Sequence, residues 1–534
     1  MTDRLKRQAR HLWKRFEVEF SHAPSKTLIH NESLQMFPIP RADLRPNTLE
    51  FETLPQVSPN GFREYDARWL YPKDINLIGF QVLGASLATL FSDLGVKPRV
   101  VVGHDYRSYS LSVKHALVIG LVSGGAEVLD IGLAVSPMAY FAQFALDAPC
   151  VAMVTASHNE NGWTGVKMGA ERPLTFGPEE MSALKQITLG GTARARAGGT
   201  YEAVAGIRER YLDDLTKGIR LSRPITVVAA CGNGTAGAFA PEALRRIGAD
   251  VVPMDDELNY DFPHYNPNPE DMKMLHALSH QVLHHKAEVG LAFDGDGDRC
   301  GVVDDNGQEI FADKVGVMLA RDIANRQPNA RFVVDVKSTG LFQTDMVLAS
   351  RGATTEYWKT GHSYIKRRAH ELKAQAGFEK SGHYFFNPPI GRGYDDGIVS
   401  AIAILQMLDR AGSKTISTLY RDLPKTFGSP TMAPFCPDEK KYLVVDEVTS
   451  GFQAAQKAGS KIMGLAIRDI VTVNGVRVTL EDGTWGLVRA SSNKPSLVVV
   501  VESPVSEERM RGMFADIDAR LSRNPLVGAY DQKI

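Results

Sequence analysis

Cysteine is scarce in this sequence and never closely paired. The 534 residues include four widely spaced cysteines with no CxxC pair, namely Cys150, Cys231, Cys300 and Cys436. This spacing argues against a disulfide framework and against a cysteine-based zinc site. It favours reduced thiols, and we therefore expect a cytoplasmic protein.

Long apolar runs and an excess of one charge are also absent. No apolar run approaches the ~18 residues that a helix needs to cross a bilayer, so we expect no transmembrane segment. The net charge of −1 creates no overall field that would attract nucleic acid, and we expect no nucleic-acid partner. Any anion must therefore be bound by a local cluster of side chains.

The N-terminal arm differs from the ordinary globular composition of the rest. Apolar residues from Leu5 to Phe20 recur at intervals of three and four among basic side chains, which predicts a basic amphipathic helix. A transit peptide, a membrane-surface helix and a helix docked on this subunit or a partner are all compatible with this pattern. The arm is thus a candidate contact for a homo-oligomer. Residues 21–59 are polar and interrupted by proline, which is typical of an extended arm.

The segment after the arm contains three copies of one α/β unit. The first strands of the copies begin at Arg99, Ile225 and Arg331, and each is followed by a helical run and a Gly-Ala pair. Strands that alternate with helices predict α/β domains with mixed, largely parallel sheets. Beyond the proline-rich residues 429–437 the repeat ends, and a smaller α+β domain is expected.

The repeat and the linkers set the expected domain boundaries. We predict a helix and arm at residues 1–58, three α/β domains at 59–200, 201–308 and 309–426, and the C-terminal α+β domain at 427–534.

Polar loops follow the third strand of each repeated unit. Ligands of open α/β sheets bind beyond the carboxyl ends of strands, so we expect the loops to converge on one site. The first strand ends at Val154 and leads into the Ser157 loop. The second ends at Phe293 and leads into Asp294–Arg299, and the third ends at Phe378 and leads into Glu379–His383.

The second loop has the composition of a metal site. Asp294, Asp296 and Asp298 alternate with glycines, which let three carboxylates turn toward one centre, and oxygen ligands suit a hard divalent cation. A calcium EF-hand does not fit, because Arg299 and Asp305 stand at its sixth and twelfth positions. A haloacid-dehalogenase-type phosphatase would need Thr or Val in place of Asp298, and a Gly-Asp turn without metal is the remaining alternative.

The first loop offers a nucleophile. Ser157 lies beside His158 and near Lys167, a set compatible with several covalent mechanisms, including acyl transfer, and also with a simple capped turn. A metal loop in the next domain favours phosphoryl transfer, which depends on positioning and charge neutralisation.

Two further loops provide polar groups for binding. Glu379, Ser381 and His383 suit the vicinal hydroxyls of a sugar, although a loop with internally satisfied groups is an equal alternative. The turn from Arg489 to Lys494 combines cations with hydroxyls, as phosphate sites do, and an ordinary turn is again an equal alternative.

Together these loops resemble the α-D-phosphohexomutase superfamily, and most closely its phosphomannomutase/phosphoglucomutase branch. The similar segments are Thr155–Asn159, Asp294–Arg299, Glu379–His383 and Arg489–Pro495, and the resemblance extends over about residues 61–525. It implies a heart-shaped molecule of four domains with a central cleft. It also implies an isomerase that interconverts the 6- and 1-phosphates of mannose or glucose through a phosphoserine and a hexose 1,6-bisphosphate.

The resemblance also implies roles for individual residues. Ser157 would carry the phosphoryl group, and one Mg²⁺ per chain would be held by Asp294, Asp296, Asp298 and the phosphoserine. Arg299 and Lys167 would neutralise charge, Lys167 or His158 would act as general acid/base, and hexose 1,6-bisphosphate would be the activator. The substrate-binding set would be Tyr65, Arg68, Lys337, Lys359, Gly361, His362, Glu379, Ser381, His383, Arg489, Ser491, Ser492 and Asn493.

The sequence departs from the family pattern at several positions. Lys380 occupies a variable place in the sugar loop, where glucosamine mutases more often have Gln, so we expect it to influence sugar preference. Ser492 and Asn493 stand where the phosphate loop usually has Asn and Thr. A phosphoglucosamine mutase and a non-catalytic sugar-phosphate-binding regulator remain as alternative functions.

Overall fold

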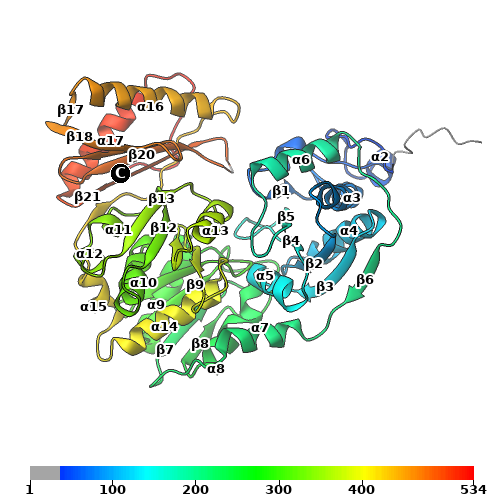
Figure 1. Ribbon diagram of the computed structural model, residues 1–534, viewed down its shortest axis with the longest axis horizontal. Coiled ribbons are helices and arrows are strands. Elements are labelled where there is room, and N and C mark those ends of the chain that lie inside the picture. Colours follow the sequence, from blue (N-terminus) through cyan, green and yellow to red (C-terminus); the bar gives the residue numbers. More distant parts are fainter. Residues whose placement is uncertain (1–35, 493) are drawn as a thin grey trace, which may run out of the picture. The chain divides into compact units, whose positions relative to one another are not determined.

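Four β-sheets organise the chain, which we describe from a computed structural model covering residues 36–492 and 494–534 (Figure 1). The expected basic helix and Asn493 lie outside the described residues. Residues 37–534 form one unit, and every element named below belongs to it. No helix in the described part of the chain is long and apolar enough to cross a membrane.

The first sheet is mixed, as predicted. Strand β2 pairs in parallel with β3 and β4, and β5 runs antiparallel to β4 and β1. Strand β6 pairs with β3 and carries this sheet a few residues beyond the expected boundary at residue 200. The strands are β1 Ala67–Leu70, β2 Arg99–His104, β3 Glu127–Leu133, β4 Cys150–Val154, β5 Trp163–Gly169 and β6 Thr200–Ala203; the helices are α3 Leu77–Asp93, α4 Ser110–Ser123, α5 Ser136–Ala145 and α6 Pro178–Leu189.

The arm packs on the first domain from about residue 37. Phe51 in the short helix α2 (Leu49–Thr53) is buried, and the amide of Asn76 donates to the carbonyls of Phe51 at 2.7 Å and Leu54 at 2.9 Å. The described part of the arm is therefore held by side-chain hydrogen bonds to the start of α3, rather than simply extended.

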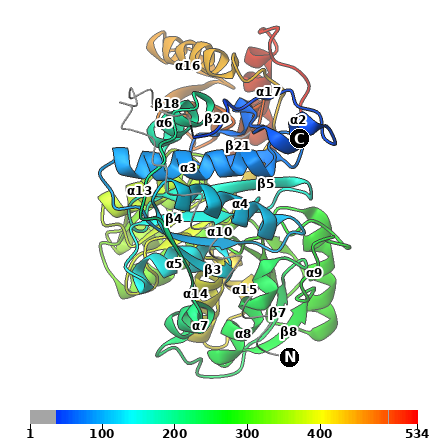
Figure 2. The ribbon, with the colours of Figure 1, turned by 90° about the vertical axis from the view of Figure 1, so that its right-hand side faces the viewer.

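The second sheet has helices on both faces. Helix α9 lies beside this sheet in Figure 2. Its apolar face packs in one cluster with Val228 and Ala292, while Ala229 and Leu291 belong to the main core together with α8. The strands are β7 Thr226–Ala230, β8 Asp250–Met254, β9 Val289–Phe293, β10 Cys300–Asp304 and β11 Glu309–Ile310; the helices are α7 Ile207–Thr216, α8 Ala240–Arg246 and α9 Met272–His285.

The third sheet repeats the same connection on a smaller scale. Strand β12 pairs in parallel with β13 and β14, and β15 runs antiparallel to β14. The strands are β12 Arg331–Asp335, β13 Thr354–Trp358, β14 Ala376–Phe378 and β15 Tyr384–Phe386; the helices are α10 Ala312–Arg326, α11 Leu341–Thr344, α12 Met346–Ser350, α13 His362–Glu371, α14 Gly397–Arg410 and α15 Ile416–Arg421.

The C-terminal sheet is antiparallel in the described residues, so the expected change of fold after the repeat is confirmed. The proline-rich linker lies along β21 through bridges that join Met432 to Val499 and Phe435 to Ser496. The strands are β16 Phe427–Gly428, β17 Lys461–Ile462, β18 Leu465–Val471, β19 Val476–Leu480, β20 Trp485–Ala490 and β21 Leu497–Ser503; the helices are α16 Lys441–Lys457 and α17 Glu507–Leu521.

The three polar loops occupy one topological place. Each connects a parallel strand of its sheet to the antiparallel strand that follows directly: β4 to β5, β9 to β10, and β14 to β15. The predicted repeat is thus a structural repeat, and the loops emerge at corresponding carboxyl ends of strands.

Candidate active site

Ser157 lies in a buried, left-handed turn after β4. Its φ angle is 52° and its side chain is 1% exposed, while its N–H donates to the Thr155 hydroxyl at 2.8 Å. The Ser157 hydroxyl donates to Oδ2 of Asp294 at 2.9 Å, and Nδ1 of His158 lies 3.4 Å away. The serine of one domain therefore meets a carboxylate of the next, as the convergence of the loops predicted.

Asp105 and Arg107, which the sequence analysis did not select, hold this turn. Oδ2 of Asp105 accepts the Thr155 hydroxyl at 2.9 Å, and Arg107 donates to the carbonyls of Ser157 at 3.0 Å and Asn159 at 2.7 Å. Both residues directly follow β2, which is the neighbour of β4. The sequence signal that could have located Asp105 and Arg107 was their position directly after a predicted strand of the same parallel sheet, because the ends of neighbouring parallel strands lie close together.

The metal loop approaches the serine turn closely because it contains glycine. A Cβ atom on Gly295 would lie 2.5 Å from the carbonyl oxygen of Ser157, so no larger residue fits there without a shift. Ser136 at the start of α5 donates to Oδ2 of Asp296 at 2.6 Å and fixes the loop from the first domain. The contact between the loops thus depends on the Gly-Asp alternation.

Asp294, Asp296 and Asp298 form a fully buried set whose oxygen atoms lie within 4.8 Å of one another. Oδ1 of Asp296 and Oδ1 of Asp298 have no hydrogen-bond partner in the described residues. Unpartnered buried carboxylate oxygens are costly, and a hard divalent cation with oxygen ligands removes that cost. The donor set therefore fits a metal ion.

Lys167 from β5 already offsets part of this charge. Its Nζ donates to Oδ2 of Asp296 at 2.7 Å and also to Asp298. Burial alone would lower the pKa of Lys167, but the two carboxylates outweigh it and raise that pKa well above its usual value. Burial, together with Asp296 and Asp298, raises the pKa of Asp294 well above its usual value. Lys167 is therefore a fixed cation, and Asp294 is the carboxylate that is most stabilised by additional positive charge.

The environment of His158 differs from that of Lys167. Burial, followed by the nearby guanidinium groups of Arg299 and Arg68, lowers the pKa of the His158 imidazole well below its usual value. The ring is therefore neutral next to Ser157. Arg68, predicted as a substrate contact, reaches the same turn and donates to the Ala156 carbonyl and to Oδ1 of Asn159 at 2.8 Å.

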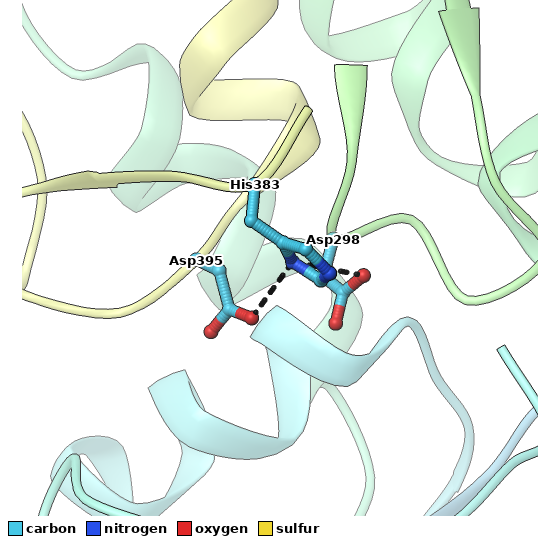
Figure 3. Close-up of side chains that lie close together, drawn as sticks. All are labelled: Asp298, His383 and Asp395. Atoms are coloured by element: carbon cyan, nitrogen blue, oxygen red, sulfur yellow. Dashed lines mark ion pairs between the residues drawn. The ribbon is translucent and has the colours of Figure 1, made fainter. Parts of the chain in front are cut away.

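His383 connects the metal loop to the third domain. Its Nδ1 lies 3.1 Å from Oδ2 of Asp395 and 3.6 Å from Oδ1 of Asp298, as Figure 3 shows, while its Nε2 accepts Nε of Arg299 at 2.9 Å. Buried Lys366 lies 2.9 Å from Asp395. Asp298, His383 and Asp395 are close enough to ligate a second metal, but Lys366 and Arg299 already provide positive charge there. The sequence analysis did not select Asp395 or Lys366, whose partners lie far away in the chain.

The predicted sugar-binding residues gather around α13. The N–H of Gly361 donates to Oε1 of Glu379 at 3.2 Å, and Ser381 donates to Oε2 at 3.3 Å. A Cβ atom on Gly361 would lie 2.6 Å from the ring of Tyr65, whose centroid is 4.8 Å from that of His362. Burial raises the pKa of Glu379 to about 7. These residues from the first and third domains form one cluster.

The predicted lysines lie around this cluster in different directions. Nζ of Lys337 is 3.7 Å from Asp335, and Nζ of Lys359 lies 5.5 Å from the ring centre of Tyr364. Lys380 donates to the linker carbonyl of Ser429 at 3.3 Å and lies over Phe311. Its ammonium is thus directed toward the linker, which does not favour the expected influence on sugar preference.

The phosphate loop follows β20. Buried Arg489 donates to Oδ1 of Asn474 at 2.8 Å and to the Ser492 hydroxyl at 3.1 Å. Lys441, which the sequence analysis did not select, donates to the carbonyl of Ser491 at 2.6 Å. Burial, followed by the nearby carboxylates of Asp66 and Glu379, raises the pKa of Tyr65 above its usual value.

Family models match the described domains along most of the chain. The phosphoglucomutase/phosphomannomutase α/β/α domains I, II and III match residues 59–195, 209–307 and 311–427, and the C-terminal domain of that family matches residues 436–520. A phosphomannomutase/phosphoglucomutase of Pseudomonas putida is 31% identical over 459 residues, which cover 86% of this chain and 95% of that protein.

The chain therefore belongs to the phosphoglucomutase/phosphomannomutase family. This confirms the resemblance to the α-D-phosphohexomutase superfamily. A phosphoglucomutase of Neisseria gonorrhoeae is 30% identical, with 85% of this chain and 95% of that protein covered. A solved structure of a family member from Burkholderia thailandensis has a TM-score of 0.78 at 28% identity and covers 88% of this chain and 98% of that one.

Proposed function

We propose that this protein interconverts the 6- and 1-phosphates of mannose or glucose through a phosphoserine at Ser157. The observation that carries the proposal is the hydrogen bond of 2.9 Å between Ser157 and Asp294, which joins a nucleophile to a buried set of metal-binding carboxylates. The family and its relatives support the same activity.

The reaction consists of two phosphoryl transfers in opposite directions. First, the free hydroxyl oxygen of the hexose 6-phosphate attacks the phosphorus on Ser157. The bond from Oγ to phosphorus breaks, the hydroxyl proton passes to an enzyme base, and Oγ takes up a proton. The resulting 1,6-bisphosphate turns over in the site. Oγ of Ser157 then loses its proton and attacks the 6-phosphorus, while the bond from O6 to phosphorus breaks and O6 takes up a proton. This releases the 1-phosphate and restores the phosphoserine. Free hexose 1,6-bisphosphate acts as an activator because it can phosphorylate an empty serine.

Asp294, Asp296 and Asp298 would hold Mg²⁺ together with an oxygen of the phosphoserine. The ion supplies positive charge for the transferring phosphoryl group. Lys167 and Arg299 supply fixed positive charge from the protein itself, since both are buried and paired with these carboxylates. Their electrostatic role needs no movement during the reaction.

Proton transfer is assigned to histidine rather than to lysine. Lys167 donates to two carboxylates and is held as a cation, so it is poorly placed to accept a proton. His158 is 3.4 Å from the Ser157 hydroxyl, and His383 is oriented by Asp395. We therefore assign the acid/base role to His158, because both ring nitrogens of His383 are already engaged, Nε2 by Arg299 and Nδ1 by Asp395.

Substrate binding is divided between two loops. Glu379 and Ser381 read the sugar hydroxyls, while Arg489, Ser491, Ser492 and Asn493 bind the phosphate that does not react. The wall between these two loops consists of Tyr65, Gly361 and His362, and Lys337 and Lys359 provide additional positive charge.

The four cysteines are free and buried, which supports a cytoplasmic location.

A coupled assay on the 6-phosphates of mannose, glucose and glucosamine tests this function. We expect turnover of mannose or glucose 6-phosphate with a 1,6-bisphosphate activator, and less turnover of glucosamine 6-phosphate. Equal or greater activity on glucosamine 6-phosphate would favour the phosphoglucosamine mutase. If Ser157→Ala retains both ligand binding and biological role, the protein is a regulator.

The N-terminal arm is proposed as a contact between subunits. We expect deletion of residues 1–36 to lower the sedimentation coefficient without reducing activity. An unchanged sedimentation state would remove this role from the arm.

A further inference from the structure

Glu64 joins three domains at the edge of the site. It belongs to the segment between residue 61 and β1 in the first domain. Its Oε2 accepts the hydroxyl of Tyr364 at 2.9 Å, and its Oε1 accepts the hydroxyl of Tyr442 at 2.5 Å. Tyr364 lies in α13 of the third domain and Tyr442 in α16 of the C-terminal domain. One carboxylate therefore uses both oxygens to connect two other domains.

The neighbours of Glu64 place this connection beside the substrate-binding residues. Tyr65, the next residue, packs against His362 at 4.8 Å and against Tyr364 at 5.7 Å between ring centroids. A cavity of 430 Å³ is lined by Glu64 and Tyr442 together with Ser492 of the phosphate loop. The connection thus bridges the sugar cluster and the phosphate loop.

The chemistry of these contacts suits a connection that can open. Tyr442 is 51% exposed, and hydrogen bonds to an ionised carboxylate are strong but compete with water where they are exposed. Lys441, the residue next to Tyr442, holds the phosphate loop by donating to the Ser491 carbonyl. The residue that contacts Glu64 and the residue that holds the phosphate loop are therefore neighbours at the start of α16.

We propose that Glu64, Tyr364 and Tyr442 form a clasp that retains the bisphosphate intermediate while it turns over. The clasp rests on the proposed mutase function, because such retention is needed only by a reaction whose intermediate must reorient without leaving the site. Glu64 acts by holding the C-terminal domain against the first and third domains. It is a positioning residue and does not contact the reacting atoms.

The main test measures how much bisphosphate escapes. With phosphorylated enzyme and labelled hexose 6-phosphate, we expect Glu64→Ala to increase the fraction of labelled bisphosphate in solution by about tenfold, which corresponds to ~1.4 kcal/mol. The variant should need more added bisphosphate for full activity, and its KM should rise. Its rate of phosphoryl transfer from Ser157 at saturating substrate should stay within about twofold of the unmodified protein.

Matched variants show whether the effect is specific to the clasp or follows the loss of any tyrosine–carboxylate hydrogen bond. Tyr442→Phe and Tyr364→Phe should each produce part of the Glu64→Ala effect. Tyr201→Phe is the control, since the Tyr201 hydroxyl donates to Asp130 at 2.9 Å within the first domain alone. Glu64→Gln, which keeps one of the two acceptor oxygens, should restore part of the retention. Equal bisphosphate release by Glu64→Ala and Tyr201→Phe would overturn the proposal.

Hydrogen exchange tests the clasp independently of catalysis. In the unliganded protein, Glu64→Ala should increase amide exchange in residues 438–445, whereas Tyr201→Phe should not. Unchanged exchange in that segment would refute the clasp even if the mutase function holds. Increased exchange in a protein without turnover would refute the mutase function and the retention role, while leaving the domain contact established.

Discussion

The Ser157 turn and the Arg489–Pro495 loop differ in how firmly the protein holds them. The serine turn is buried and receives hydrogen bonds from Asp105 and Arg107 in its own domain, and its hydroxyl reaches Asp294 in the next. In the phosphate loop, Ser491 and Ser492 are partly exposed, and Lys441 and Asn474 of the same domain supply contacts. The difference teaches that the reacting group is fixed by contacts from two domains, while the loop assigned to the distant phosphate is more exposed and is held by contacts within its own domain.

The largest effect is expected at the metal-binding carboxylates. Asp296→Asn removes a charged ligand and the partner of Lys167, and we expect kcat to fall by at least ~10³-fold, as for loss of preorganised electrostatic groups. Calorimetric titration with Mg²⁺ should show loss of binding.

Asp304→Asn is the matched control for that variant. Asp304 is also buried in the second sheet, but its Oδ1 accepts the N–H groups of Asn306 and Gln308, which an asparagine can also do. Activity and Mg²⁺ binding should be retained. If Asp296→Asn binds Mg²⁺ as well as this control does, the metal assignment is wrong.

An intermediate effect is expected behind the metal loop, at Asp395. Asp395→Asn leaves Lys366 buried without its charged partner and His383 without its orienting carboxylate. We expect ~3–5 kcal/mol of lost unfolding free energy, because breaking a buried ion pair leaves an uncompensated charge. Urea denaturation followed by circular dichroism measures it.

Lys366→Met separates the contribution of the Lys366–Asp395 ion pair to stability from the contribution of Asp395 to activity. Removal of the ammonium leaves Asp395 paired with His383, so we expect the mutase reaction to be retained better than in Asp395→Asn. Equal losses of kcat in the two variants would argue against an orienting role of Asp395 on His383.

The smallest of these effects is expected in the Arg489–Pro495 loop. Arg489→Lys keeps the positive charge but loses the planar guanidinium that contacts both Asn474 and Ser492. KM should rise by about tenfold with little change in kcat, since the phosphate that this loop binds does not react. Initial-rate kinetics measure both constants.

Arg520→Lys provides the control for the phosphate loop. Arg520 pairs with Asp516 within helix α17 of the same domain. Its replacement should leave KM unchanged. A fall in kcat without a change in KM for Arg489→Lys would contradict the assigned binding role.

Much of the fold followed from local sequence patterns. The apolar run at residues 150–154 forms β4 at those bounds, and Arg331–Asp335 forms β12, because buried parallel strands read as continuous apolar segments. The repeat placed three loops at one topological position. The family resemblance, rather than periodicity, supplied the four-domain architecture and the substrate class.

The supporting residues of the site could not be predicted in the same way. Asp395 meets His383 only after α14 and β15 pack together, and Lys366 reaches Asp395 from α13. The direction of Lys380 was not predictable either, because its place in the sugar loop said nothing about its contact with Ser429. Such contacts depend on tertiary packing, which a pattern of neighbouring residues does not encode.

The central claim is that Ser157 carries the phosphoryl group. Incubation of the purified protein with glucose 1,6-bisphosphate, followed by intact-mass measurement and peptide mapping, tests it most directly. We predict one added phosphate per chain, located on Ser157 and lost on addition of excess hexose 6-phosphate. The absence of phosphate on Ser157, or a stable phosphate at another residue alone, would contradict the mechanism.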